Sequence, residues 1–229
     1  MRISWACAKV IIINNYLSLI SKYINSPIII HQLFYMLINR IRLLRTGVHT
    51  WILRKKTRIE IGKATLVYFK SHILNKGENS SVAIGDNCLI GRSDYCYHAG
   101  MPFSTTILCD GKNSRVIVGD NCRINGAYIH AESEITIGKN CVIASGVNII
   151  DSNGHEVGSY NRTAGRDTPR PIIIGNNVWI GMNAIILKGS EIGDNSIVAA
   201  GTIVKGHYPM NSIIHTAPAI TDEIQFNKE

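Results

Sequence analysis

The sequence predicts an all-β protein, a parallel β-helix built from hexapeptide repeats, with an N-terminal helical segment in front of it. An excess of β-branched aliphatic residues and a repeat with a period of six predict this fold class. The chain has 229 residues, among them 39 Ile and 12 Val against 12 Leu. Because Ile and Val lose rotamer freedom in a helix, this excess favours strands.

The first 58 residues are apolar and basic, and they precede the repeats. They hold ten Lys or Arg and no Asp or Glu, whereas the rest of the chain has 14 basic and 16 acidic residues. We expect helices at about 10–24 and 28–46. The segment either caps the main domain or lies on an acidic membrane surface. A transmembrane span is disfavoured, because the uncharged stretch between Lys22 and Arg40 is short and contains polar residues. The body of the chain lacks the basic balance of a nucleic-acid-binding domain.

From residue 172 onward, aliphatic residues occupy every sixth position, and the residue four places later is mostly small. The aliphatic series is Ile174, Ile180, Ile186, Ile192, Val198 and Val204. The same frame recurs upstream, beginning at Ile61, Ile84, Val118 and Ile137. A period of six is not that of an α-helix, but it is typical of short strands that tight corners join into a solenoid. We expect the aliphatic and small residues to point inward, and the coils to stack because none can bury its inner face alone.

Asparagines and cysteines fit the same frame. Pairs of residues at 86–87, 120–121, 176–177 and 194–195 each end in Asn, which tolerates the left-handed backbone of a tight corner. The small inward position is taken by Cys88, Cys122 and Cys141, so we expect them to pack in the core without thiol chemistry. None of the six cysteines forms a CxxC pair or a zinc-type cluster. A chain of this length can bury a core without disulfides, which favours a reducing, cytoplasmic compartment.

The repeat frame breaks between Ile149 and Ile174. The segment 151–171 is polar and contains several Gly and Pro residues. We expect it to form a loop that projects from one coil, and loops on rigid scaffolds often carry function. His155 stands near its start.

The repeats, together with the stretch IGNNVWIGMNAIILKGSEIGDN at 174–195, resemble the bacterial hexapeptide-repeat acyltransferases. The closest type is the sugar and polysaccharide O-acetyltransferases that act on galactosides, maltose, capsule or lipopolysaccharide. The resemblance covers about 59–219, and it implies a left-handed β-helix, acetyl-CoA as the donor, and a homotrimer with active sites between subunits. We therefore expect an N-terminal segment at 1–58, a β-helix domain at 59–219 and a tail at 220–229.

The function that the resemblance implies is acetyl-CoA-dependent transfer of acetyl to a saccharide hydroxyl in surface polysaccharide or lipopolysaccharide biosynthesis. The enzyme would be cytoplasmic, or peripheral on the inner face of the cell membrane through 1–58. No metal is expected.

His155 matches the catalytic histidine of the family, in the loop before the IGNNVWIG coil. A sugar hydroxyl needs a base during its attack on a thioester, and imidazole, which titrates near pH ~6.5, suits this task. Asp151 is expected to orient the ring, to contact the acceptor, or only to shape the turn, and Glu156 is a weaker alternative base. Asn125 matches an asparagine that stabilises the oxyanion in galactoside acetyltransferases, although corner asparagines are common in this fold. His130 occupies a core-facing slot of the frame and is expected to be structural or interfacial.

Four residues match the donor site of the family. Trp179 matches the tryptophan beside the pantetheine arm, Met182 and Ala200 match positions whose backbone meets the pantetheine, and Lys205 stands where a phosphate-facing charge is expected. Residues 216–220 depart from the family pattern, so contacts to the nucleotide end of CoA do not carry over.

Three other functions fit the sequence less well. N-acylation of an amino sugar nucleotide often comes with a nucleotide-binding domain, for which 1–58 is too short and lacks a glycine-rich phosphate loop. A γ-type zinc carbonic anhydrase needs three converging histidines, and Tyr160 stands where a second would be expected. A non-catalytic scaffold is disfavoured because His155 and Trp179 occur together.

Overall fold

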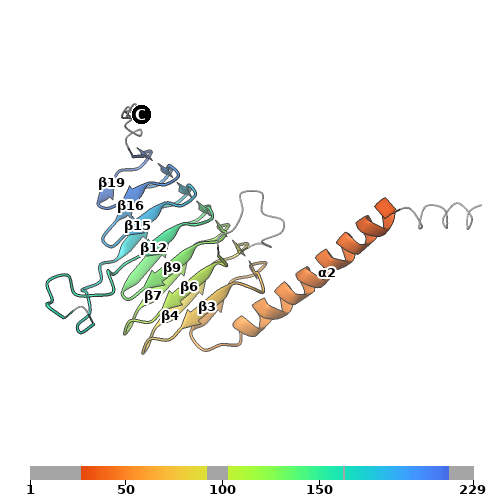
Figure 1. Ribbon diagram of the computed structural model, residues 1–229, viewed down its shortest axis with the longest axis horizontal. Coiled ribbons are helices and arrows are strands. Elements are labelled where there is room, and N and C mark those ends of the chain that lie inside the picture. Colours follow the sequence, from red (N-terminus) through yellow and green to blue (C-terminus); the bar gives the residue numbers. More distant parts are fainter. Residues whose placement is uncertain (1–26, 92–102, 162, 217–229) are drawn as a thin grey trace, which may run out of the picture. The chain divides into compact units, whose positions relative to one another are not determined.

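The computed structural model describes residues 27–91, 103–161 and 163–216. In it, short parallel strands wind through three sheets, and a typical coil gives one strand to each sheet (Figure 1). This arrangement is the all-β, left-handed parallel β-helix that the sequence predicts. The corners between sheets form three edges of a prism, which decide where each candidate residue lies.

We name the sheets by the order in which the chain enters them. Sheet A consists of β1 (Ile59–Ile61), β4 (Ser81–Ile84), β7 (Arg115–Val118), β10 (Glu134–Ile137), β13 (Ile172–Ile174), β16 (Glu191–Ile192) and β19 (His207–Tyr208). Sheet B consists of β2 (Leu66–Val67), β5 (Leu89–Ile90), β8 (Arg123–Ile124), β11 (Val142–Ile143), β14 (Trp179–Ile180), β17 (Ile197–Val198) and β20 (Ile213–Ile214). Sheet C consists of β3 (His72–Asn75), β6 (Thr106–Cys109), β9 (Tyr128–Ala131), β12 (Asn148–Ile150), β15 (Ile185–Leu187) and β18 (Ile203–Val204).

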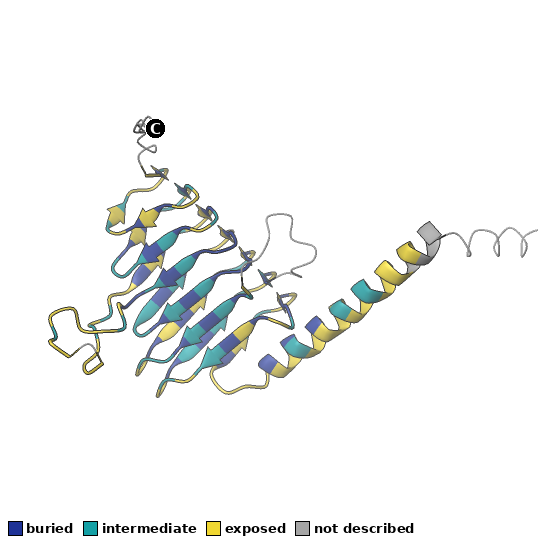
Figure 2. Cartoon of the chain, in the orientation of Figure 1, coloured by how far each residue is buried: buried dark blue, intermediate teal, exposed yellow. Residues whose placement is uncertain are grey.

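The core follows the predicted repeat (Figure 2). The six aliphatic positions from Ile174 to Val204 each expose 1% or less of their surface. The small positions between them are also buried, and Cys88, Cys122 and Cys141 expose at most 2%. Alternate residues of each strand point outward, as the pleat requires. The predicted inward frame of these repeats is therefore confirmed.

Asparagine corners join the strands as expected. Asn87, Asn121, Asn177 and Asn195 all have positive φ, between 55° and 60°. Their side chains also bond along the stack, since Asn177 Nδ2 donates to Asn195 Oδ1 at 3.0 Å. Asn thus recurs at these corners for two reasons. It tolerates the left-handed backbone, and its side chain bonds to the equivalent Asn on the next coil.

A helix precedes the first strand. Helix α2 runs from Pro27 to Leu53, so it includes the predicted helix at 28–46 and continues for seven residues beyond it. The predicted helix at 10–24 lies outside the described residues. Contacts divide the chain into two units, 1–45 and 46–229, so the last turns of α2 belong to the β-helix unit. There Leu53 is buried and Thr50 Oγ1 accepts a hydrogen bond from the Val67 N–H at 2.9 Å.

None of the helices in the described residues has both the length and the apolar character needed to cross a bilayer.

Candidate functional site

The loop at 151–171 leaves sheet C after β12 and enters sheet A at β13, with the bounds that the sequence predicts. In Figure 1 it projects from the coils at the left of the picture. Its first residue, Asp151, is fully buried. The Asp151 carboxylate accepts hydrogen bonds from the backbone N–H groups of Glu132 and Ser133, at 2.8 and 2.7 Å. Burial raises the pKa of the Asp151 carboxyl, and these two hydrogen bonds act in the opposite direction. The side chain therefore ties the root of the loop to the preceding coil.

A second carboxylate fixes the loop from its other arm. Asp167 accepts a hydrogen bond from the Asn153 N–H at 2.8 Å and forms an ion pair with Lys188. The side chains of Asp167 and Lys188 are only 10% and 14% exposed. The Lys188 ammonium beside Asp167 holds the pKa of that carboxyl below its usual value. Because Asn153 is two residues before His155, this pair fixes the backbone that presents the histidine. The sequence pattern did not single out either member of the pair.

His155 itself is exposed on this tethered loop. No hydrogen bond to its ring comes from the residues that the structure describes. The neighbouring Gly154 has a φ of 75°, and its N–H donates to Ser152 Oγ at 3.0 Å. A left-handed turn therefore leads directly into His155. The arrangement presents an imidazole to solvent on a backbone that is fixed at both ends.

A histidine and two carboxylates cluster where sheet C ends. Potential ligand atoms of Asp110, His130 and Glu132 lie within 4.8 Å of one another, so this cluster could accommodate a cation. His130 Nε2 lies 2.7 Å from Asp110 Oδ1, whereas Glu132 Oε1 is buried without a hydrogen-bond partner among the described residues and has the Arg166 Nη1 at 3.7 Å. We read the cluster as a polar support beneath the loop.

The core-facing position predicted for His130 is wrong. In β9 the inward residue is Ile129, which is fully buried, while His130 lies on the outer face at intermediate exposure. The neighbouring ring of Tyr128 lies 5.8 Å from that of His130, between centroids.

The residues matched to the donor site gather mainly at the edge between sheets B and C. The Gly201 N–H donates to Met182 O at 2.8 Å, which places Met182 and Ala200 at equivalent corners of adjacent coils. Trp179 precedes that corner on β14, where its side chain is 53% exposed on the outer face of sheet B. Lys205 is exposed after β18, at the edge between sheets C and A.

Asn125 belongs to the same edge as Met182 and Ala200. It follows β8, and its N–H donates to Ile143 O at 3.1 Å. The residue is 7% exposed, and its Oδ1 is buried with no hydrogen-bond partner among the described residues. A buried amide oxygen of this kind costs free energy unless a ligand or a neighbouring chain supplies a donor.

Within one chain the candidate residues therefore fall into two groups. His155 and Asp151 lie at the edge between sheets C and A, and Asn125 lies at the edge between sheets B and C with Met182 and Ala200. The two edges are separate corners of the prism. A site that needs both groups therefore needs more than one chain or a rearranged loop.

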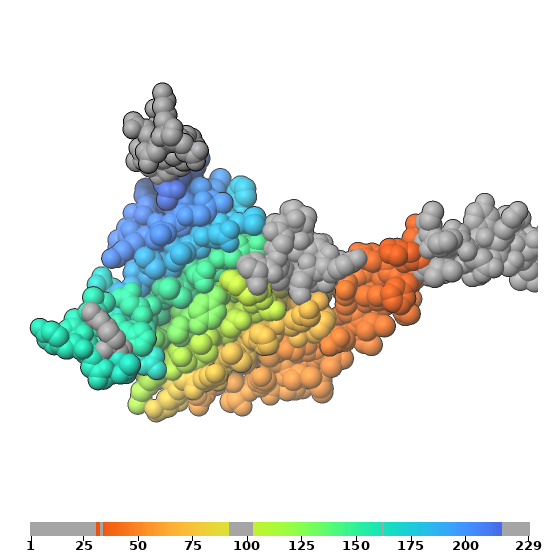
Figure 3. Space-filling view, viewed as in Figure 1, coloured from red at the N-terminus to blue at the C-terminus, as the bar shows by residue number. Residues whose placement is uncertain are grey.

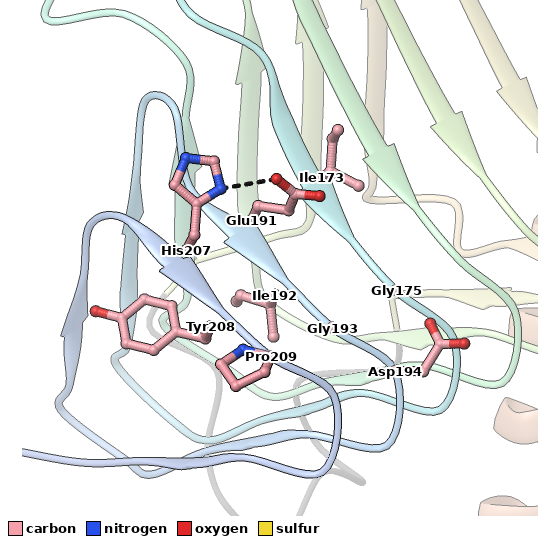
Figure 4. A pocket seen from close by; sticks show the side chains of 9 residues that line it. All are labelled: Ile173, Gly175, Glu191, Ile192, Gly193, Asp194, His207, Tyr208 and Pro209. Carbon is pink, nitrogen blue, oxygen red and sulfur yellow. Dashed lines mark hydrogen bonds and ion pairs between the residues drawn. The ribbon is translucent and has the colours of Figure 1, made fainter.

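A shallow hollow of about 530 Å³ lies elsewhere, on the outer face of sheet A (Figure 4). Its lining includes Ile173, Glu191, His207 and Tyr208. His207 Nδ1 lies 2.7 Å from Glu191 Oε2, because β16 and β19 pair these two residues in register. Both side chains are more than half exposed. None of the predicted site residues lines this hollow.

Two models of repeat families match the chain. The one described as bacterial transferase hexapeptide (six repeats) matches residues 171–206. The one described as hexapeptide repeat of succinyl-transferase matches 81–96 and 115–150. Apart from 92–96, which lie outside the described residues, these segments lie within the coils that the structure forms.

Individual proteins match parts of the chain. A galactoside O-acetyltransferase of Escherichia coli is 43% identical over 84 residues, which is 37% of this chain and 41% of that protein. A polysialic acid O-acetyltransferase of Neisseria meningitidis is 32% identical over 127 residues, 49% of this chain and 58% of that protein. The matches thus span about half the length of these relatives. Among solved structures, a galactoside acetyltransferase in complex with coenzyme A aligns with 25% identity and a TM-score of 0.48, covering 77% of this chain and 70% of that one.

Proposed function

We propose that this chain is a bacterial hexapeptide-repeat transferase, an acetyl-CoA-dependent O-acetyltransferase that modifies a saccharide. The observation that carries the proposal is the presentation of His155. An exposed imidazole stands on the loop that interrupts the repeats, and hydrogen bonds to the carboxylates of Asp151 and Asp167 hold the root of that loop. The names of the matched relatives support O-acetylation as the reaction type.

In the proposed reaction His155 is the general base. A ring nitrogen accepts the proton of a sugar hydroxyl while the hydroxyl oxygen attacks the thioester carbonyl of acetyl-CoA. The C–O bond that forms gives a tetrahedral oxyanion. When the C–S bond breaks, the imidazolium returns the proton to the departing thiolate, so the products are the acetyl ester and free CoA. No other co-reactant is required.

We assign Asn125 to the oxyanion. Its amide nitrogen is the donor that a developing negative charge requires, and a preorganised donor of this kind typically contributes about 10²–10³-fold to kcat. The buried position of Asn125 supports a fixed orientation of the amide. For Asp151 we propose a positioning role, since its carboxylate is engaged by two backbone amides and is fully buried.

For the donor we propose a binding surface along the edge between sheets B and C. The exposed indole of Trp179 would lie beside the pantetheine arm, and the backbone at Met182 and Ala200 offers groups from two adjacent coils to an extended chain. Lys205 would supply positive charge for a phosphate, although it lies on another edge and would reach the donor of a neighbouring chain.

We propose a homotrimer, the assembly that the resemblance implies, and the separation of the two groups supports a site shared between chains. His155 and Asn125 occupy different edges of one prism, and a closed three-fold ring brings one edge of each chain against a different edge of the next. We therefore propose that each active site combines the loop of one chain with the corner residues of its neighbour.

The acceptor is proposed as a sugar of a surface polysaccharide or lipopolysaccharide, acetylated in the cytoplasm. The polysialic acid acetyltransferase among the relatives supports the polysaccharide class. The four described cysteines are free and buried, which is consistent with a reducing compartment.

The function can be tested in two steps. Purified protein should release CoA from acetyl-CoA in proportion to ester formed on an added surface glycan, and much more slowly without the glycan. In a strain that lacks this chain, the surface glycan should lose an O-acetyl signal in its nuclear magnetic resonance spectrum. An unchanged glycan, together with no transfer to hydroxyl acceptors in vitro, would reject the proposal. Amide products on an amino sugar would instead identify N-acylation.

A further inference from the structure

Helix α2 carries a stripe of large apolar side chains that its own chain leaves exposed. Successive members of the stripe are three or four residues apart, so they share one face of the helix. Each exposes between 48% and 69% of its surface, and they are Phe34, Leu37, Ile41, Leu44, Val48 and Trp51. An exposed apolar surface of this extent on a single element indicates an interaction site.

The C-terminal half of the helix also has a face that is already occupied. Thr46, Thr50 and Leu53 repeat at intervals of four and three, and each exposes 5% or less of its surface. Thr50 Oγ1 donates to Thr46 O at 2.8 Å and accepts from the Val67 N–H of the first coil. Val48 and Trp51, in the same turns, are 50% and 60% exposed. The exposed stripe is therefore a second face, distinct from the one that fastens the helix to the β-helix.

The charges of α2 have a single sign. Between Pro27 and Leu53 the helix has three arginines, at 40, 42 and 45, and no Asp or Glu. Lys55 follows directly, with its Nζ 5.9 Å from the centre of the Trp51 ring. The charged side chains of α2 are all cations, so its exposed apolar stripe complements a surface with an apolar interior and a negatively charged headgroup layer, which describes an anionic bilayer.

A second copy of α2 fits this face less well. The alternating spacing would suit a parallel coiled coil, but Arg40 and Arg45 flank the stripe, and a second copy of α2 brings no Asp or Glu against them. In parallel copies these arginines would face one another. Met36 and Leu43 are also exposed, at 52% and 64%, and at 100° per residue they lie about 120° around the helix from the stripe, so the exposed apolar surface is not confined to a coiled-coil seam.

We propose that the stripe-bearing face of α2 docks in the plane of an anionic lipid surface. The apolar side chains enter the boundary between headgroups and acyl chains, and the arginines extend to the phosphates. Trp51 would sit at headgroup depth, where tryptophan is favoured. The proposal is independent of the acetyl-transfer chemistry, and it would hold the β-helix close to membrane-linked glycans.

Binding can be measured with the full-length chain and vesicles of known composition. One set contains phosphatidylcholine alone, and the other contains phosphatidylcholine mixed with phosphatidylglycerol. At low salt we expect the protein to sediment with the anionic set and much less with the neutral set. In a variant that keeps only Trp51, W5F/W179F, the fluorescence should shift to the blue when anionic vesicles are added. Failure of the unaltered chain to bind anionic vesicles at low salt overturns the proposal.

Paired variants separate the apolar and the charge contributions. L37Q/L44Q should abolish sedimentation, and R40Q/R45Q should lower the partition coefficient about 30-fold. The matched controls I117Q/I173Q and K76Q/K112Q remove two apolar and two basic side chains that are exposed on the β-helix, and they should bind like the unaltered chain. Equal binding by L37Q/L44Q and the unaltered chain would overturn the proposal. A loss of oligomer mass in L37Q/L44Q without loss of vesicle binding would assign the face to a second copy of the helix.

Discussion

His155 is either the general base or an ordinary surface histidine, and its replacement distinguishes the two. Its side chain is exposed, so His155→Ala should change the free energy of unfolding by no more than about 0.5 kcal/mol. If the ring is the general base, kcat should fall roughly 10²–10⁴-fold while acetyl-CoA still binds. Transfer rates and calorimetric donor affinity, measured on the same preparation, check both expectations.

The matched control is His207→Ala, which removes another exposed histidine that is paired with a carboxylate, on sheet A. It should leave turnover unchanged. Near-normal turnover in a correctly assembled His155→Ala protein would remove His155 from the mechanism, and Glu156 would become the next candidate base.

The Asp167–Lys188 pair is expected to act on catalysis through the backbone before His155. Asp167→Asn keeps the shape of the side chain but loses the ion pair that anchors the Asn153 N–H. Displacement of His155 should lower kcat by about 10–100-fold, with little change in donor affinity. The measurement is the transfer rate of Asp167→Asn, with Asn161→Asp as a control in the exposed part of the same loop. Equal rates in the two variants would contradict this expectation.

The same pair predicts how stability depends on pH. The Asp167 pKa is lower in the folded chain than its ordinary value of about 3.9, so the pair stabilises the fold above that pH. This contribution is lost as pH falls through the folded-state pKa, because protonation removes the ion pair. Urea unfolding between pH 6 and about pH 3 should therefore show a steeper loss in the unaltered chain than in Asp167→Asn.

At the scale of single elements, the asparagine corners can be tested at Asn177. Its φ is 55°, and its side chain is exposed at the end of the Asn ladder on the last coils. Asn177→Ala places an ordinary side chain in the left-handed region, which should lower the free energy of unfolding by roughly 1–2 kcal/mol. Asn177→Gly tolerates that backbone and should cost less. If urea unfolding found Ala and Gly equal, backbone strain would not explain why Asn recurs here.

The strands and the loop also show which features of the fold the sequence pattern predicts and which it does not. The inward frame at 174–204 and the loop at 151–171 were predicted, because a period of six and its interruption are visible without knowledge of long-range contacts. His130 was misplaced because the corner between β8 and β9 is one residue short: the inward Ile124 and Ile129 are five residues apart, whereas their partners Ile143 and Ile149 are six apart. A shift of one residue turns a side chain to the other face. The Asp167–Lys188 pair was missed because the path of the loop alone joins residues 21 positions apart.

At the scale of the whole molecule, the triangular cross-section keeps the two halves of the candidate site on separate edges. The chain passes from sheet A to B to C, so the loop at the edge between sheets C and A stays apart from Asn125, Met182 and Ala200 at the edge between sheets B and C. The loop projects from the coils at the left of Figures 1 and 3. A rigid prism of this kind cannot close on a substrate. We therefore expect assembly to complete the site, with a mass in light scattering of about three times 25.3 kDa.

Complementation between inactive chains tests this sharing directly. In a closed trimer, a site needs His155 from one chain and Trp179 with Asn125 from the next. His155→Ala and Trp179→Ala proteins should each be nearly inactive. When they are co-expressed with different tags and purified as mixed trimers, one of the three interfaces in every mixed trimer has both groups intact, so activity should return to about one third of that of the unaltered trimer. Trimers of one variant alone, expressed with both tags and purified in the same way, supply the control. If each site lay within one chain, mixing would restore nothing, because every chain in the mixed trimer would still lack one group.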